Sequence, residues 1–307
     1  MKGTSQLREL MARGETIWSP VVYDALTAKI AEAVGFEVIF VSGSNVSVGF
    51  AGLPDVGLTT MTEVMTVSRN IVNATTIPVM VDSDTGWGNA INVRRTVQEF
   101  VRAGVAGILL EDQVAPKRCG WVAGKQVLSV EEAVGKYRAA VDAKNELDPD
   151  FCVVARTDVR GAVGGDFEQA IRRGQAYVEA GADMVFLEAL QSVEEVERTA
   201  REVPGPKWFN YFRTAPMALS RVNELGYTFI VTGFLQRAAS RAAWDFAVAL
   251  KEDGVAAINA FEESMKDHPL EDYHAFSGLP GVRLLEEKYL PEEEVARKYA
   301  ESVGYQP

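Results

Sequence analysis

The chain alternates between amphipathic stretches and short runs of continuous apolar residues. The apolar runs predict strands near 18–22, 37–42, 77–82, 106–111, 151–156, 184–188, 207–210 and 227–232. The amphipathic stretches predict helices near 24–34, 60–74, 90–103, 130–146, 166–180, 193–202, 215–225 and 235–252. Strands that are apolar at every position are buried on both faces, as in a parallel sheet covered by helices.

A weak internal repeat supports this order of elements. At four places a helical pattern ends in a glycine and a strand follows, at Gly35, Gly104, Gly181 and Gly226. Eight strand-then-helix units predict an α/β fold, a (β/α)8 TIM-type barrel. A doubly wound sheet is the alternative, but no G-x-G-x-x-G follows the first strand. The glycine-rich segment 161–165 lacks a P-loop lysine and is interpreted as a loop.

The pattern changes after residue 252. Residues 254–307 predict additional helices without another buried strand, and no Pro-, Gly- or Ser-rich linker precedes them. We therefore expect one barrel domain over 1–307, with a barrel core at about 18–252 and a C-terminal helical tail at about 254–307. The first 15 residues predict an amphipathic helix rather than a targeting segment.

Composition excludes several classes of partner. The 307 residues carry a formal net charge of -12, which argues against nucleic acid or an anionic membrane as a partner. No segment approaches the roughly 20 apolar residues that a membrane span needs. With two cysteines, Cys119 and Cys152, a disulfide scaffold is not expected, and a reducing, cytoplasmic location is the simpler interpretation.

Polar residues gather where the predicted strands end. In a barrel of this type, the carboxyl ends of the strands form the active site. Seven of the eight strands end in polar residues, which are Tyr23 and Asp24, Ser42 to Ser44, Asp82 and Asp84, Glu111 and Asp112, Arg156 to Asp158, Glu188, and Asn210. For Asp24 and Asp158, helix or turn capping is an equally good interpretation.

The residue types favour magnesium, with manganese as an alternative. The two histidines, His268 and His274, lie in the tail, so a histidine-based zinc site is not expected. Magnesium uses one or two carboxylates, keeps several waters and often binds its substrate directly. The substrate should therefore be an oxygen chelator such as a 2-oxo or 2-hydroxy acid, and Arg156 could pair with its carboxylate.

The loop after the fourth strand carries a second kind of chemistry. It reads Lys117-Arg118-Cys119-Gly120-Trp121, and two cations beside a cysteine should favour the thiolate and make Cys119 a usable acid or base. A basic loop with an incidental cysteine is the alternative. Glycines near 119–124 are typical of a mobile loop that closes over a site.

Six motifs in unbroken order resemble those of the isocitrate lyase and phosphoenolpyruvate mutase superfamily, most closely its methylisocitrate lyase branch. They are SGS at 42–44, GLPDVGLTT at 52–60, DSDTGWGNA at 82–90 followed by NV at 92–93, GILLEDQ at 107–113, KRCG at 117–120 and ARTD at 155–158. The resemblance implies a magnesium-containing barrel and a homotetramer with exchanged C-terminal helices. It also implies reversible carbon–carbon cleavage of a 2-hydroxy acid into a 2-oxo acid and a dicarboxylate.

The same resemblance implies roles for individual residues. Asp84 would bind the metal directly, and Asp55, Asp82 and Glu111 would hold metal-bound waters. Cys119, in the loop with Lys117 and Arg118, would protonate the carbanion left by cleavage. The remaining residues would contact the substrate: Ser42, Gly43 and Ser44 on the 2-oxo acid with Tyr23 nearby, Arg156 on its carboxylate, and Glu188 and Asn210 on the outer carboxylates or the acid.

One departure from the superfamily pattern bears on specificity. Trp121 follows Gly120 where a histidine is usual, and the segment 211–213 is unusually aromatic. We therefore expect a less polar pocket that accepts a substituted malate or a larger apolar group. Decarboxylation or hydrolysis of oxaloacetate on the same metal site is an alternative activity, and a non-catalytic binding barrel is a further one. The Lys-Cys-Gly motif disfavours carbon–phosphorus chemistry.

Overall fold

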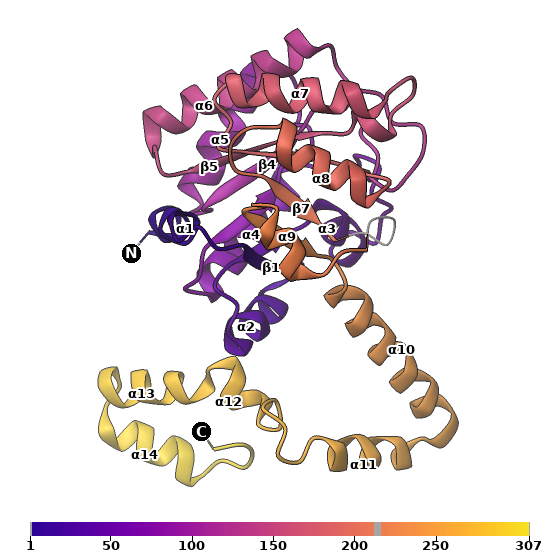
Figure 1. Ribbon diagram of the computed structural model, residues 1–307. Helices are drawn as coiled ribbons and strands as arrows, with labels where there is room; N and C mark the ends of the chain where they lie inside the picture. The colour runs from indigo at the N-terminus through magenta and orange to yellow at the C-terminus, as the bar shows by residue number, and fades with distance from the viewer. Residues whose placement is uncertain (1, 212–215, 307) are drawn as a thin grey trace. The chain divides into compact units, whose positions relative to one another are not determined.

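Eight parallel strands form a nearly closed barrel, which confirms the predicted fold (Figure 1). The computed structural model describes residues 2–211 and 216–306. The sheet order is β6-β5-β4-β3-β2-β1-β8-β7, and a parallel bridge between Val185 and Lys207 joins its two edges. The strands are β1 (Ile17–Val22), β2 (Ile39–Val41), β3 (Val79–Asp82), β4 (Gly107–Glu111), β5 (Cys152–Thr157), β6 (Met184–Leu187), β7 (Trp208–Asn210) and β8 (Phe229–Thr232).

Helices surround the sheet and alternate with its strands (Figure 1). Those before the tail are α1 (Gly3–Ala12), α2 (Ala25–Val34), α3 (Gly43–Gly49), α4 (Met61–Ala74), α5 (Ala90–Arg102), α6 (Val130–Leu147), α7 (Phe167–Glu179), α8 (Val193–Glu202), α9 (Leu219–Glu224) and α10 (Leu235–Asp253). Sequence patterns missed α3 and a 3-10 turn, η1 (Val159–Gly161). The predicted start of the helix at 215 lies outside the described residues.

Local signals explain where the helices begin and end. Asp24 accepts a hydrogen bond from the Thr27 amide at the start of α2, so its capping interpretation is confirmed. The four glycines of the internal repeat all have positive φ, which glycine adopts without steric cost. Each helix therefore ends sharply, and the chain turns directly into the next strand.

The core has two layers, one between the strands and helices and one inside the barrel. Side chains from alternate strand positions fill the interior, among them Cys152, Val154, Phe186 and Trp208. Cys152 is thus a core residue. Leu7 and Leu10 of α1 belong to the same interior cluster, so this helix closes the amino-terminal end of the barrel.

The contacts divide the chain into two compact units, residues 1–238 and 239–307, with the boundary inside α10. The second unit is helical, as predicted for the tail, and continues with α11 (Val255–Ser264), α12 (Tyr273–Ser277), α13 (Leu279–Tyr289) and α14 (Glu292–Ala300). Within it, Phe246 packs on Phe261, and the Arg283 guanidinium lies 3.6 Å from the centre of the Tyr299 ring. Among the described residues, no helix is long and apolar enough to cross a membrane.

Candidate active site

The period-two alternation of the strands explains how the polar residues come together. In β5, Arg156 follows the interior residues Cys152 and Val154 at the next inward-facing position. Glu188 stands in the same relation to Phe186, and Glu111 to Leu109. The polar ring predicted at the strand ends therefore lies directly above the apolar interior.

A cavity of about 520 Å³ opens at this end of the barrel. The predicted residues that line it are Ser42, Ser44, Asp55, Asp82, Lys117, Cys119, Gly120, Trp121, Arg156, Glu188 and Asn210. Its floor is the apolar layer of the barrel interior nearest the carboxyl ends of the strands, formed by Val21, Phe40, Leu109, Phe186 and Val231. The site is thus polar at the strand ends and apolar between them.

Five predicted site residues do not line the cavity. Gly43, Asp84 and Glu111 are buried beside the lining residues Asp82, Lys117 and Arg156, whereas Tyr23 and Arg118 lie elsewhere. Tyr23 is not among the residues that line the cavity, because β1 ends at Val22 and the chain turns into α2. Arg118 is exposed and lines a separate small pocket on the other side of its loop. The structure therefore does not support direct substrate contact by either side chain. In the loop, the Lys117 side chain points into the cavity and the Arg118 side chain points away from it.

Asp84 occupies a constrained position after β3. Its backbone has a φ of 46°, and its amide donates to Asp82 Oδ1 over 3.1 Å. The Gly43 amide donates to Asp82 Oδ2 over 3.2 Å, and a Cβ on Gly43 would come within 2.8 Å of Asp84 Oδ1. Only glycine at position 43 allows α3 to approach the two acids so closely.

Lys117 joins two of the predicted metal-site acids. Its ammonium lies 2.5 Å from Asp55 Oδ1 and 2.7 Å from Asp84 Oδ1, and all three side chains are buried. Burial raises the pKa of Asp84 to about 6 although Lys117 opposes the shift. Burial would lower the pKa of Lys117, but the surrounding acids outweigh it and raise that pKa well above its ordinary value.

The acidic cluster fits a magnesium ion. Asp84 Oδ1 contacts Lys117 only as an ion pair, and buried Glu111 Oε1 has no hydrogen-bond partner among the described residues. Burial also raises the pKa of Glu111 well above its ordinary value, which a divalent cation would reverse. No three acidic, histidine or cysteine side chains of the described part are grouped tightly enough to enclose a metal together. One direct carboxylate, with waters held by the others, is the arrangement that suits magnesium.

Arg156 is fixed in the wall of the cavity by acids on several sides. Its Nε and Nη2 atoms each donate to the Asp158 carboxylate over 2.9 Å, and Nη1 lies 3.5 Å from Glu111. Nη2 also lies 3.7 Å from Glu188. The side chain of Asp158 makes no capping hydrogen bond, so the capping interpretation of that residue is wrong. Asp158 instead orients the cation predicted to meet the substrate.

Cys119 lies in the loop between β4 and α6, and a bridge joins the two ends of this loop. Gln113 and Val127 form an antiparallel bridge, and the Cys119 amide donates to the Asp55 carbonyl over 3.0 Å. Burial raises the pKa of the Cys119 thiol, and Arg156 and Lys117 do not reverse this. This direction runs against the expectation of a stabilised thiolate. Lys117 is already paired with Asp55 and Asp84, and Cys119 lines the cavity.

Comparison with known proteins identifies the family. The chain matches the family model of phosphoenolpyruvate phosphomutase over residues 7–251. It is 39% identical over 294 residues to the 2,3-dimethylmalate lyase of Eubacterium barkeri, covering 94% of this chain and 99% of that enzyme. The chain belongs to the phosphoenolpyruvate mutase/isocitrate lyase superfamily. It is also 43% identical over 228 residues to the 2-methylisocitrate lyase of Aeropyrum pernix, covering 73% and 72% of the two chains.

Solved structures of this superfamily share the fold along nearly the whole chain. A 2,3-dimethylmalate lyase superposes with a TM-score of 0.88 at 28% identity, covering 99% of both chains. A phosphonopyruvate hydrolase complexed with oxalate and Mg²⁺ gives 0.83 at 29% identity, covering 95% and 100%. An oxaloacetate acetylhydrolase bound to 3,3-difluorooxalacetate gives 0.80 at 29%, covering 94% and 97%. The predicted superfamily and its carbon–carbon lyase class are thus confirmed.

Sequence reasoning missed several residues that line the cavity of this superfamily member. They are Asn45, Gly233, Phe234, Gln236 and Arg237, besides the apolar floor, whereas Tyr211 of the aromatic segment lines the cavity as expected. The floor residues could have been found from the period-two pattern, two positions before each polar strand end. The residues of 233–237 follow a strand that ends without a charged residue and gave no such signal. Phe212 and Arg213, part of the aromatic segment after strand seven, lie outside the described residues.

Proposed function

We propose that the protein is a magnesium-dependent lyase that cleaves a carbon–carbon bond of a 2-hydroxy acid, with an alkyl-substituted malate or a methylisocitrate-like acid as substrate. One observation carries the proposal: a single cavity is lined by half-buried Cys119, by Asp55 and Asp82 of the candidate magnesium site, and by an apolar floor. The products would be a 2-oxo acid and a carboxylic acid fragment. Magnesium is supported by the donor set, with Mn²⁺ as the alternative ion.

The proposed mechanism divides the work between two sides of the cavity. Asp84 would hold the metal directly, with Asp55, Asp82 and Glu111 on its waters, and the bound ion would stabilise negative charge on the 2-oxo acid. Ser42 and Ser44 would bind that fragment, and Arg156 would pair with its carboxylate.

Cys119 would complete the reaction on the other fragment. The 2-hydroxyl group would lose its proton to a carboxylate of the site as the carbon–carbon bond breaks, which forms the 2-oxo acid and leaves the electron pair on the other carbon. The thiol would donate its proton to that carbon and become a thiolate. The apolar floor excludes water, which lowers competition from solvent for the carbanion. Glu188 and Asn210 border the same space and would orient the second fragment.

The remaining lining residues support an alkyl-substituted substrate. Trp121, Tyr211 and Phe234 add aromatic surface to the cavity. Arg237 also lines it, and no hydrogen bond or ion pair joins its side chain to another described residue. A cation beside aromatic surface suits an acid with one outer carboxylate and apolar substituents. This combination agrees with the substrate named for the relative that matches nearly all of the chain.

A steady-state screen tests the proposal. With Mg²⁺ present, we expect turnover of 2,3-dimethylmalate and related substituted malates, with kcat/KM at least tenfold above that for isocitrate. Release of the 2-oxo acid is followed with lactate dehydrogenase. A wide preference for methylisocitrate would contradict the less polar pocket, and failure to cleave any of these acids would contradict the lyase.

Hydrolysis of oxaloacetate is the second candidate. The match to an oxaloacetate acetylhydrolase along 94% of the chain favours it, since the same metal site and Arg156 could bind oxaloacetate. Hydrolysis would activate water and would not need the thiol of Cys119 as proton donor to a carbanion. The position of Cys119 in the cavity therefore favours the lyase.

A further inference from the structure

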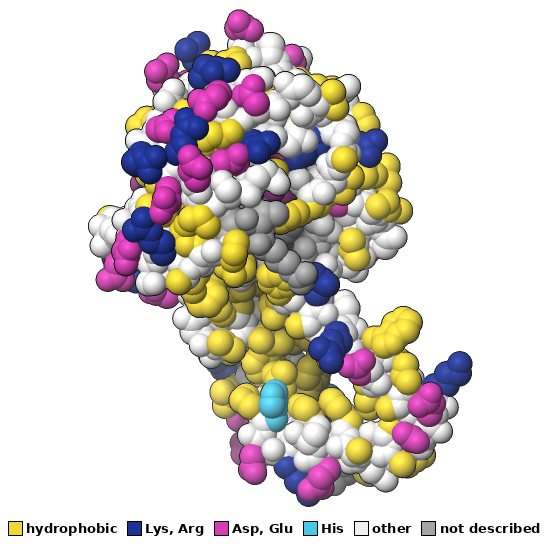
Figure 2. All heavy atoms as spheres, turned by 45° about the vertical axis from the view of Figure 1, so that its right-hand side comes forward, with side chains coloured by type: hydrophobic (Ala, Val, Ile, Leu, Met, Phe, Trp, Pro, Cys, Tyr) yellow, Lys and Arg dark blue, Asp and Glu magenta, His cyan; other side chains and the backbone are white. Residues whose placement is uncertain are grey.

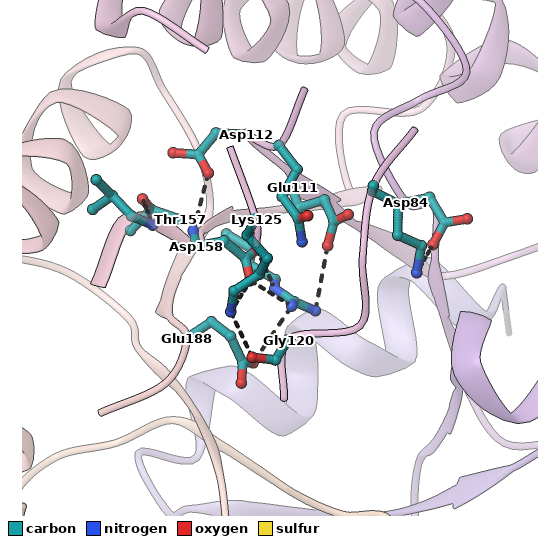
Figure 3. Close-up of polar contacts among 12 residues, drawn as sticks. Asp84, Glu111, Asp112, Gly120, Lys125, Thr157, Asp158 and Glu188 are labelled. Carbon is teal, nitrogen blue, oxygen red and sulfur yellow. Dashed lines mark hydrogen bonds and ion pairs between the residues drawn. The ribbon is translucent and has the colours of Figure 1, made fainter. Parts of the chain in front are cut away.

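A buried lysine outside the cavity connects the Cys119 loop to the barrel. The side chain of Lys125 is only 1% exposed and does not line the cavity. Its ammonium donates to the Gly120 carbonyl over 2.5 Å and lies 3.2 Å from Asp158 Oδ1, as Figure 3 shows. One cation thus joins the peptide next to Cys119 to a fixed acid after β5.

The Gly120 backbone packs tightly against the side chains of the cavity wall. A Cβ at this position would lie 2.6 Å from Arg156 Nη2 and 2.8 Å from Glu188 Oε1. The loop backbone therefore presses directly on two residues of the cavity wall. Because Gly120 follows Cys119 in the chain, any movement of its peptide also moves the thiol.

Lys125 is itself held by a segment that does not belong to the loop. Its carbonyl accepts a hydrogen bond from the Val163 amide over 2.9 Å, within a parallel bridge to Ala162. A Cβ on Gly161 would come within 3.0 Å of the lysine ammonium, so glycine there leaves space for it. The glycine-rich segment 161–165 thus forms a support for the lysine.

The charge of Lys125 is balanced by an acid that it shares with Arg156. The Asp158 carboxylate accepts from both cations and is fully buried. Burial would raise the pKa of Asp158, but Arg156 and Lys125 outweigh it and lower that pKa. Without the lysine, the Gly120 carbonyl would lose its partner, and Asp158 would act on Arg156 alone.

We propose that Lys125 is a positioning residue that holds the Cys119 loop against Arg156 and Glu188 in the cavity wall and orients Arg156 through Asp158. The catalytic part of this inference rests on the proposed role of Cys119 as proton donor. The placement of the loop does not depend on any substrate. The two parts can therefore be tested separately.

The test compares Lys125→Met with a matched variant, Lys144→Met. Lys144 is also buried, and its ammonium lies 2.8 Å from Asp183 at the opposite end of the barrel. For Lys125→Met we expect kcat to fall about 100-fold with a smaller change in KM, as for a misplaced catalytic group. We also expect iodoacetamide to alkylate Cys119 at least fivefold faster, with buried Cys152 as an internal reference. Lys144→Met should lower Tm without either effect.

Each outcome decides a separate point. Alkylation and kcat equal to those of Lys144→Met would overturn the inference. Faster alkylation together with no turnover by the wild type would support the loop placement and contradict the proposed function. If Lys125→Met does not fold, Lys125→Gln removes the charge with less loss of polarity, and unchanged alkylation in that variant would equally overturn the inference.

Discussion

At the residue scale, the environment of Cys119 determines what this side chain can do. Neighbours in the sequence are poor guides to its pKa, because Lys117 points to Asp55 and Asp84 and Arg118 points away. Burial is the largest effect and raises the pKa of the thiol, which favours its neutral form. A neutral thiol can deliver a proton to a carbanion, whereas a thiolate cannot.

Replacement of Cys119 by serine should therefore abolish cleavage without loss of the fold. We expect kcat for the best 2-hydroxy acid to fall by about 10²- to 10⁴-fold, because a hydroxyl is a weaker acid than a thiol. In the wild type, kcat should hold through neutral pH and fall as the pH rises through the raised pKa of Cys119. Steady-state rates between pH 6 and 11 measure both effects.

Cys152→Ala provides the control, because this cysteine lies in the barrel interior and should be dispensable for turnover. Full activity of Cys119→Ser toward oxaloacetate, with no cleavage of substituted malates by the wild type, would favour the hydrolase instead.

At the scale of single elements, α1 closes the amino-terminal end of the barrel and is an addition to the eight strand-then-helix units. Leu7 and Leu10 extend the interior cluster beyond the strands. Arg8 fixes the helix by pairing with Asp183 over 2.7 Å. The cavity lies at the other end of the barrel, so this helix contributes stability rather than chemistry.

Leu7→Ala should lower the free energy of unfolding by about 2–4 kcal/mol, since a fully buried leucine leaves a cavity when truncated. Urea denaturation measures the change, and kcat/KM at 25 °C should stay within twofold of the wild type. Glu9→Ala, at an exposed position of the same helix, should change stability by less than about 0.5 kcal/mol. Loss of activity in folded Leu7→Ala would show that α1 also shapes the site.

At the scale of the whole molecule, the second unit leaves many apolar side chains exposed. Packing within this small unit does not cover them. Figure 2 shows hydrophobic side chains exposed on its helices. Trp244 is 73% exposed and Leu284 67%, and within α11–α14 only Ala257 and Val295 are buried among the described residues. Large exposed apolar surfaces mark association sites. We therefore propose that this tail packs on another subunit, and the resemblance to the superfamily implies a homotetramer in which it is exchanged.

Light scattering after size exclusion should show the mass of a tetramer at micromolar concentration. The double variant Leu284→Asp and Leu285→Asp should shift the mass toward a smaller species, because charges on the apolar face are costly to bury. Glu287→Gln, on the same helix, is the control and should leave the mass unchanged. A monomeric wild type would contradict the exchange.

The sequence by itself determined the barrel and most of its polar ring. Continuous apolar strands, helix-ending glycines and acids at strand tips are local signals, and the period of two places Asp82, Glu111, Arg156 and Glu188 on one inward face. Only the tertiary structure decided the burial that raises the pKa of Cys119, the outward position of Arg118 and the absence of Tyr23 from the cavity wall. It also revealed the support that Lys125 gives to Gly120. These features depend on burial and on contacts between segments far apart in the chain, which no local pattern records.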